Sequence, residues 1–348
     1  MLQKRLDNVT TLKDLSRHLK LSVTQVSRAL NDHDDVSQAT KERVQKAAKL
    51  LNYRVNMSAK RLVTGRSGIV GLVVEQDGDV LEPQLFTQVI WGLSHAFSER
   101  GRQFILHATG AGGDVLREYE SLIDSAGIDG FVITEPTLND RRIAYLINRK
   151  VPFVVHGRVP DHTDYAFYDI DNFAVGHDLT RYLIDRGHQR IAFLNGPANR
   201  TYVEARREGY VAALTGAGLA LDQTLHITGD MAATAGLVSC IRLFDKDNVS
   251  PTAIVCSNIT LAEGAYAGLK ALGLAVPDDV SVVAHDDLLP GHAATSFTPP
   301  LTTTMVPLSK GWPPIADLLS REIDGAPLEQ VQMVESMDLI ERGSVRTL

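Results

Sequence analysis

The chain has 348 residues, of which 44% are hydrophobic and 22% charged, a composition that suits two or three packed domains and excludes a disordered chain. Its net charge of −7 is unevenly distributed, because residues 1–66 carry +8 and the remainder −15. This asymmetry is typical of a nucleic-acid-binding head on an acidic body.

Cysteine content and apolar runs indicate the cellular compartment. Cys240 and Cys256 lack zinc-type spacing, so neither a metal finger nor a disulfide framework is indicated, and a reducing cytoplasm is favoured. The N-terminus has no apolar signal core, and no run approaches the ~18 apolar residues of a membrane span. We therefore expect a cytoplasmic, nucleoid-associated protein with no membrane partner.

Residues 9–31 have the pattern of a helix-turn-helix. From Leu12, leucines recur at i, i+3 and i+7, and Thr10 or Thr11 can cap this first helix. Ser22 is a suitable N-cap for a second helix, whose outward side chains would meet a major groove. On periodicity alone, an ordinary helical bundle explains the pattern equally well.

A third helical run over residues 38–52 follows Ser37, and residues 53–62 are basic and free of acidic side chains. With LSVTQVSRALN and VS-x-x-TKERV, this stretch resembles the DNA-binding head and hinge of the lactose-repressor (LacI/GalR) family. The resemblance implies a hinge that becomes helical on DNA and wedges Leu62 into the minor groove. The DNA-binding residues that it implies are Thr11, Leu12, Ser22, Val23, Thr24, Ser27, Arg28, Asn31, Asn56, Ala59 and Leu62.

From Gly68 onward, short apolar strands alternate with amphipathic helices, which predicts a doubly wound parallel α/β body in two similar halves with a cleft between them. The predicted strands are residues 69–74, 103–107, 130–134, 152–156, 190–195, 252–256 and 281–285. The predicted helices are residues 86–100, 116–125, 141–149, 172–186, 204–217 and 262–272.

Segments such as RYLIDRGHQRIAFLNGP and LGLAVPDDVSVVAHDD resemble the family's effector-binding core, which is similar to periplasmic sugar-binding proteins. The resemblance implies a head and hinge over residues 1–66 and an effector-binding and dimerisation core over residues 67–348. The chain would cross three times between the halves, so that residues 67–166 with 305–331 form the first and residues 167–304 with 332–348 the second. A homodimer on a pseudo-palindromic, double-stranded operator is implied.

Candidate effector ligands follow strand ends, where ligands bind in open α/β folds. By resemblance, Arg206 matches the family arginine that grips effector hydroxyls or a carboxylate, and an arginine fork beside an amide and a carboxylate suits vicinal hydroxyls. The alternative is that these polar groups merely satisfy one another, or that the apolar members pack in the core. The predicted effector-binding residues are Glu75, His156, Arg158, Phe167, Arg206, Met231, Asn258 and Asp286.

Three places depart from the family pattern. Ile259 replaces the usual acidic residue after the amide, and Val55 replaces the proline before the hinge asparagine. Trp312-Pro313-Pro314 interrupts an expected helix, which we predict to begin at Pro313.

Other motifs do not support catalysis or a cofactor. The glycines around Gly112 match neither phosphate-loop pattern, and no nucleophile elbow is present. The run from His285 to Asp287 has metal-ligand residue types, but consecutive strand residues point in different directions, so we expect no metal site there.

The sequence therefore predicts a transcriptional regulator, most simply a repressor released by a small sugar. The rival from another class is a sugar-kinase-like enzyme carrying a helix-turn-helix, and a further rival is a regulator whose ligand is a purine or a phosphoprotein partner. FVVHGR and TEPTLNDRRI most resemble the α-glucoside branch of the family.

Overall fold

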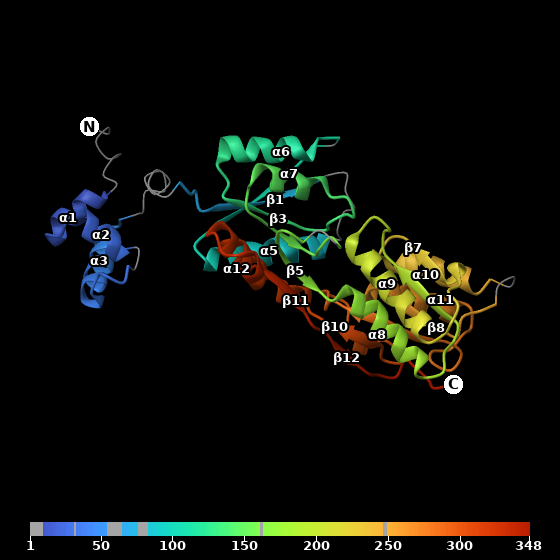
Figure 1. The fold of residues 1–348 in the computed structure, drawn as a ribbon. Helices are drawn as coiled ribbons and strands as arrows, with labels where there is room; N and C mark the ends of the chain where they lie inside the picture. The colour runs from blue at the N-terminus through green and yellow to red at the C-terminus, as the bar shows by residue number, and fades with distance from the viewer. Residues whose placement is uncertain are drawn as a thin grey trace, which may run out of the picture. The chain divides into compact units, whose positions relative to one another are not determined.

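The computed structural model describes residues 10–30, 33–53, 65–75, 83–110, 112–160, 163–245 and 249–348 (Figure 1). The chain forms two compact units, Met1–Ser67 and Gly68–Leu348, with a boundary one residue beyond the predicted one. The predicted DNA-binding residues Asn31, Asn56, Ala59 and Leu62 lie outside the described residues. No helix in the described part of the chain is long and apolar enough to span a membrane.

The head consists of the three predicted helices, α1 (Leu12–Leu19), α2 (Val23–Leu30) and α3 (Gln38–Leu50). One fully buried residue from each helix, namely Leu15, Val26 and Val44, meets the others in a small core. Such a core is limited in size, so the helix ends contribute a large share of the stability.

Side-chain caps fix both helices of the helix-turn-helix. Thr11 and Asp14 form a capping box, in which the Asp14 N–H donates to Thr11 Oγ1 and the Thr11 N–H donates to Asp14 Oδ2. Ser22 and Gln25 make the same reciprocal pair at the start of α2. The predicted caps at Thr11 and Ser22 are therefore present, and they fix where each of the two helices begins.

In the first half of the body, six parallel strands have the order β11-β5-β4-β3-β1-β2. Helices α5 and α12 cover one face, and α6 and α7 cover the other (Figure 1). The strands are β1 (Ile69–Val74), β2 (Gln103–Ala108), β3 (Gly130–Ile133), β4 (Phe153–His156), β5 (Ala166–Ile170) and β11 (Gln332–Glu335). The helices are α5 (Pro83–Glu99), α6 (Val115–Ser121), continued as a π-helical turn (Leu122–Ala126), α7 (Arg141–Arg149) and α12 (Trp312–Ile323).

In the second half, the order is β12-β10-β9-β8-β6-β7, and β12 is antiparallel to β10. Along β6, Ala192 and Leu194 face the core under α10 and α11, while Ile191 and Phe193 face α8 and α9. The strands are β6 (Ile191–Asn195), β7 (His226–Thr228), β8 (Ala253–Cys256), β9 (Ser281–Asp286), β10 (Thr302–Met305) and β12 (Asp338–Ile340). The helices are α8 (Asn172–Ile184), α9 (Thr201–Gly216), α10 (Ala233–Leu243) and α11 (Ile259–Ala271), with short 3₁₀ turns at Gln223–Leu225, Ala294–Ser296, Leu308–Gly311 and Leu328–Gln330.

The chain crosses between the halves three times, but at other residues than predicted. Strand β5 pairs with β4, so the first half extends through Ile170 rather than ending at residue 166. Strand β10 remains in the second sheet through Met305, and β11 joins the first sheet through Glu335 rather than opening the second half at residue 332. Strand pairing decided these boundaries, and a short apolar segment does not carry that information in its own sequence.

The helix predicted to begin at Pro313 begins one residue earlier, at Trp312. Both prolines lie in its first turn, where their missing N–H groups break no intrahelical hydrogen bond. The Trp312 ring packs in the first half and meets His156 edge-on, with ring centroids 5.6 Å apart.

Candidate effector cavity and DNA-reading helix

The start of α2 presents an exposed polar surface. Val23, Thr24 and Arg28 are exposed and Ser27 is half-buried, as expected for a groove-reading face. Leu12 is partly buried and packs against the head core, and its predicted contact with DNA stays a prediction.

Arg28 does not lie free on this surface. Its Nε donates to Asp35 Oδ1 at 3.1 Å, and its Nη2 lies 2.7 Å from Asp35 Oδ2. Because both side chains are about half exposed, the pair contributes little to stability. A guanine would therefore meet an arginine that already has an anionic neighbour.

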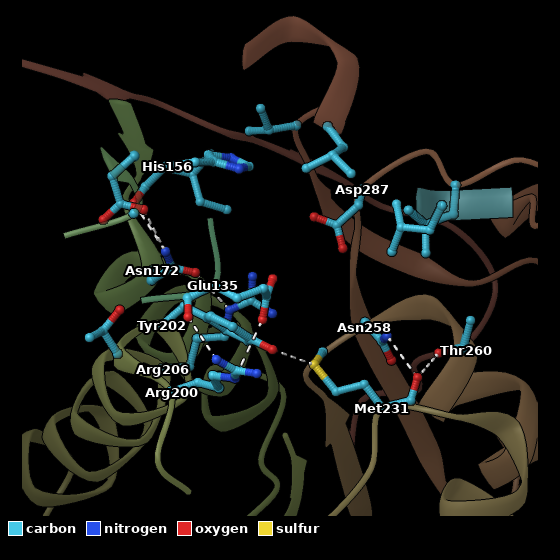
Figure 2. A pocket seen from close by; sticks show the side chains of 18 of the residues that line it. Glu135, His156, Asn172, Arg200, Tyr202, Arg206, Met231, Asn258, Thr260 and Asp287 are labelled. Atoms are coloured by element: carbon cyan, nitrogen blue, oxygen red, sulfur yellow. Dashed lines mark hydrogen bonds and ion pairs between the residues drawn. The ribbon is translucent and has the colours of Figure 1, made fainter. Parts of the chain in front are cut away.

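A cavity of about 490 Å³ lies in the body, lined by residues of both halves. Figure 2 shows Arg206, Asn172 and Tyr202 on one side, with Asp287, Asn258 and Thr260 on the other. The volume is within the range of small-molecule sites. Of the predicted effector residues, His156, Arg206, Met231 and Asn258 line this cavity.

The other four predicted effector residues are not among the residues that line the cavity. Glu75 is exposed at the end of β1, and Phe167 is buried in the core under α6 and α7. Arg158 binds Asp169 rather than facing the cavity, and Asp286 accepts a hydrogen bond from the Leu288 N–H at 2.8 Å. Core packing accounts for the position of Phe167, an ion pair for that of Arg158 and a local hydrogen bond for that of Asp286.

Arg206 is buried on α9 and is held by three hydrogen bonds. Its Nε donates to Asn172 Oδ1 at 2.8 Å, while its Nη1 donates to the Ser257 carbonyl oxygen at 2.5 Å and to Ser257 Oγ at 3.1 Å. Nη2 is left without a hydrogen bond in the described part of the chain, so its N–H groups are available to a ligand. Burial lowers the pKa of the guanidinium, against the opposing effect of Asp287.

Two glycines allow α9 to approach α8 closely enough for these bonds. A Cβ at Gly176 would collide with the backbone of Arg206, and a Cβ at Gly209 would collide with the backbone of Phe173. Close helix contact at these positions places Arg206 beside Asn172, the first residue of α8.

Asn172 and Asp169 extend the hydrogen bonding from Arg206 toward the first half. Asn172 Nδ2 donates to Asp169 Oδ1 at 2.9 Å, and Arg158 Nε lies 3.1 Å from Asp169 Oδ2. Burial raises the pKa of Asp169 to about 7, although Arg158 acts in the opposite direction. Neither Asp169 nor Asn172 was predicted, although both line the cavity.

Asp287, rather than the predicted Asp286, is the carboxylate of the opposite wall. Its Oδ1 lies 3.2 Å from His285 Nε2. Burial opposes ionisation of Asp287, yet His285, Arg206 and His156 together hold its pKa below the ordinary value. Burial lowers the pKa of His156 to about 4, so this histidine is neutral at physiological pH. An ionised carboxylate thus faces the cavity beside a neutral imidazole.

Asn258 has a structural role in addition to its place on the wall. Its Oδ1 caps α11 by accepting from the Leu261 N–H at 2.9 Å, and its Nδ2 donates to the Met231 carbonyl at 3.3 Å. Thr260 Oγ1 donates to the same carbonyl at 2.6 Å, and Tyr202 Oη lies 3.2 Å from Met231 Sδ. This wall is therefore fixed by internal hydrogen bonds.

Two loops from different halves meet at the edge of the cavity. The Leu138 N–H donates to the Asn199 carbonyl at 3.1 Å, and the Thr201 N–H donates to the Pro136 carbonyl at 3.2 Å. Arg200 Nη1 donates to the carbonyl oxygen of Glu135 at 2.7 Å, where Glu135 has a left-handed φ of 51°. These contacts bridge the halves, and no sequence motif indicated them.

The family models and the relatives agree on what this chain resembles. Residues 67–337 match the model of periplasmic binding proteins and the sugar binding domain of the LacI family, and residues 11–56 match that of bacterial regulatory proteins of the lacI family. The HTH-type transcriptional regulator AglR of Rhizobium meliloti (strain 1021) is 39% identical over 84% of this chain and 82% of its own length. CelR of Thermobifida fusca, also an HTH-type transcriptional regulator, is 34% identical over 92% of this chain and 93% of its own length.

Solved structures extend the similarity to the fold. A complex of the transcriptional regulator CelR with cellobiose has a TM-score of 0.69 and 30% identity to this chain, and the match covers 96% of this chain and 99% of that one. The predicted architecture, a helix-turn-helix head and a body of two parallel-dominated sheets, is thus confirmed.

Proposed function

Because the chain belongs to the LacI family of bacterial regulatory proteins, we propose that it is a cytoplasmic, nucleoid-associated repressor of carbohydrate uptake or catabolism genes, released from its operator by a neutral sugar. It acts as a homodimer on a pseudo-palindromic site, and each head reads one half-site. The observation that carries the sugar proposal is the open Nη2 edge of Arg206 in a cavity that also holds an ionised carboxylate, Asp287. Donors and acceptors on facing walls suit vicinal hydroxyls.

The charge of the cavity argues for an uncharged effector. The lining has four carboxyl groups, on Glu135, Asp169, Asp230 and Asp287, and two cationic side chains, Arg200 and Arg206. Arg158, behind the lining, pairs with Asp169, which leaves three carboxyl groups against two arginines. A phosphorylated sugar or a uronate would enter against a net negative field, which disfavours binding. Apolar lining from residues such as Met231 and Leu289 gives a sugar ring a surface for its C–H faces.

The solved complex of CelR with cellobiose supports a glucoside as the effector class. The first experiment is therefore a thermal-shift screen of the full chain against sucrose, maltose, trehalose and cellobiose, with glucose 6-phosphate and hypoxanthine as competing classes. A specific ligand raises the melting temperature because it binds only the folded state. At a ligand concentration of about a hundred times Kd, it adds about 2.7 kcal/mol to the free energy of unfolding. The sugar that raises the melting temperature should then release the protein from operator DNA, as measured by fluorescence anisotropy.

The proposal fails if no neutral sugar shifts the melting temperature, or if hypoxanthine or the phosphorylated sugar does so instead. We propose further that the chain is not an enzyme. ATP turnover by the purified protein in the presence of these sugars would instead support the sugar-kinase-like alternative.

A further inference from the structure

Three buried side chains, Arg206, Asn172 and Asp169, and the partly exposed Arg158 form a continuous hydrogen-bonded path from the effector arginine to the place where the chain passes between the halves. Arg206 binds Asn172, Asn172 binds Asp169, and Asp169 binds Arg158. Asp169 belongs to β5 of the first sheet, whereas Asn172 opens α8 of the second half. The path therefore runs across the first crossing of the chain, between residues 170 and 172.

Asp169 and Arg206 together fix which way the Asn172 amide points. An arginine can only donate and an ionised carboxylate can only accept, so Asn172 directs its Oδ1 toward Arg206 and its Nδ2 toward Asp169. A protonated carboxyl can donate to Asn172 Oδ1 and so compete for the acceptor that Arg206 Nε uses. Arg206 would then lose one of the three hydrogen bonds that hold its guanidinium in place.

We infer that Asp169 and Asn172 are positioning residues for the effector site, and that they act as a hydrogen-bonded relay which holds Arg206 Nη2 toward the ligand. This inference rests on the proposed function of the cavity. The relay deepens that proposal because it makes effector affinity depend on a group at the junction of the two halves.

The environment of Asp169 supports a pH-dependent relay. Asp169 is 5% exposed. The titratable and charged groups that act on it or feel its charge are Arg158 after β4, Arg206 on α9, Asp171 at the start of α8, and Tyr165 and Tyr168 at β5. Because the pKa of Asp169 is raised to about 7, the relay loses its ionised form as the pH falls through that value.

The test compares the wild-type chain with Asp169→Asn and Asn172→Ala, using whichever of sucrose, maltose, trehalose or cellobiose gives the largest melting shift. If only the ionised form binds, affinity at pH 6 should be about tenfold weaker than at pH 8. Asp169→Asn cannot titrate, so its affinity should be constant between these two pH values. Asn172→Ala should lose sugar affinity at both pH values while it still binds operator DNA.

Asp178→Asn serves as the control, because it removes a half-exposed carboxylate from the same helix, α8. It should reproduce the wild-type pH profile. If Asp169→Asn keeps the wild-type pH profile, or if Asn172→Ala binds the sugar as tightly as wild type, the relay is wrong. The proposed sugar-responsive function would survive either result.

A second measurement needs no sugar and so separates the relay from the proposed function. In ¹⁵N-arginine spectra of the full chain, the Arg206 Nε–H signal can be assigned from its loss in Arg206→Lys. That signal should shift with a midpoint near pH 7 in the wild type and in Asp178→Asn, and should not titrate in Asp169→Asn. A signal that is independent of pH in the wild type would overturn the relay even if the sugar binds.

Discussion

Replacing Arg206 by lysine tests the centre of the proposed site. Lysine keeps the positive charge but carries its three N–H donors on a single nitrogen, so its Nζ cannot serve both the Asn172 side and the Ser257 side as the Arg206 fork does. One or two acceptors then stay unsatisfied in a buried place. At about 1–3 kcal/mol each, the free energy of unfolding should fall by about 1–6 kcal/mol.

From the sequence, Arg206 could be an effector ligand, whose change to lysine would abolish release by sugar but preserve folding, or an internal hydrogen-bond partner, whose change would lower the melting temperature. The structure shows internal hydrogen bonds and one open edge on the same guanidinium. We therefore expect Arg206→Lys to lose both stability and release by sugar, with operator binding retained below the lowered melting temperature.

The assay is calorimetric melting combined with an operator-release titration at 20 °C. A loss of this size should lower the melting temperature on the order of 10 °C. Arg207→Lys is the matched control, because Arg207 is the next residue of α9 and pairs with Glu204 at a partly exposed position. Its stability should change by less than about 0.5 kcal/mol, and its response to sugar should be normal. An Arg206→Lys protein with wild-type melting and wild-type release would refute the reasoning.

Four further measurements test other parts of the chain. Arg28→Ala should cost about 1–3 kcal/mol on the specific operator and little on random DNA, as measured by anisotropy. Leu62→Ser should reduce both operator affinity and DNA bending in a circular-permutation gel. Gly209→Ala should destabilise the body by at least about 1–3 kcal/mol in denaturant titrations, whereas Gly216→Ala, on the same helix with open space around it, should be neutral or stabilising. Folding raises the pKa of Asp169 to about 7. The contribution of Asp169 to the free energy of unfolding is therefore complete below about pH 4 and is lost as the pH rises through about 7. Between about pH 5 and 8, the melting temperature of the wild type should fall more than that of Asp169→Asn.

Local patterns predicted the elements of this fold well. The helix over residues 141–149 was predicted at its observed bounds, because Ile143 and Leu146 form a buried stripe between the Asp140 cap and the left-handed Lys150. The strand Ile69–Val74 was also predicted, since its apolar run is bounded by Gly68 on one side and Glu75 on the other. Periodicity and caps are properties of neighbouring residues, and the sequence displays them directly.

Pairings between distant residues could not be predicted in the same way. Strand β5 was missed because its five residues become a strand through pairing with β4 and β11. Arg206 was predicted through its resemblance to a family position, but its partner Asn172 lies 34 residues away and has no motif of its own. Asp287 lines the cavity, whereas its neighbour Asp286 is the last residue of β9. A sequence pattern does not locate the end of a strand to within one residue, so it could not tell which of the two carboxylates faces the cavity.

The contacts at the cavity edge limit what an effector must supply. Glu135 and Pro136 of the first half bind Arg200 and Thr201 of the second half. An effector can shift the arrangement of the halves only by binding one arrangement more tightly than another, and a tenfold fall in operator affinity requires a coupling of about 1.4 kcal/mol. One charge-assisted hydrogen bond to the open edge of Arg206, made in a single arrangement, is worth about that much. The coupling free energy that release requires is therefore small. It depends on holding the open edge of Arg206 in place rather than on a large interface that closes between the halves.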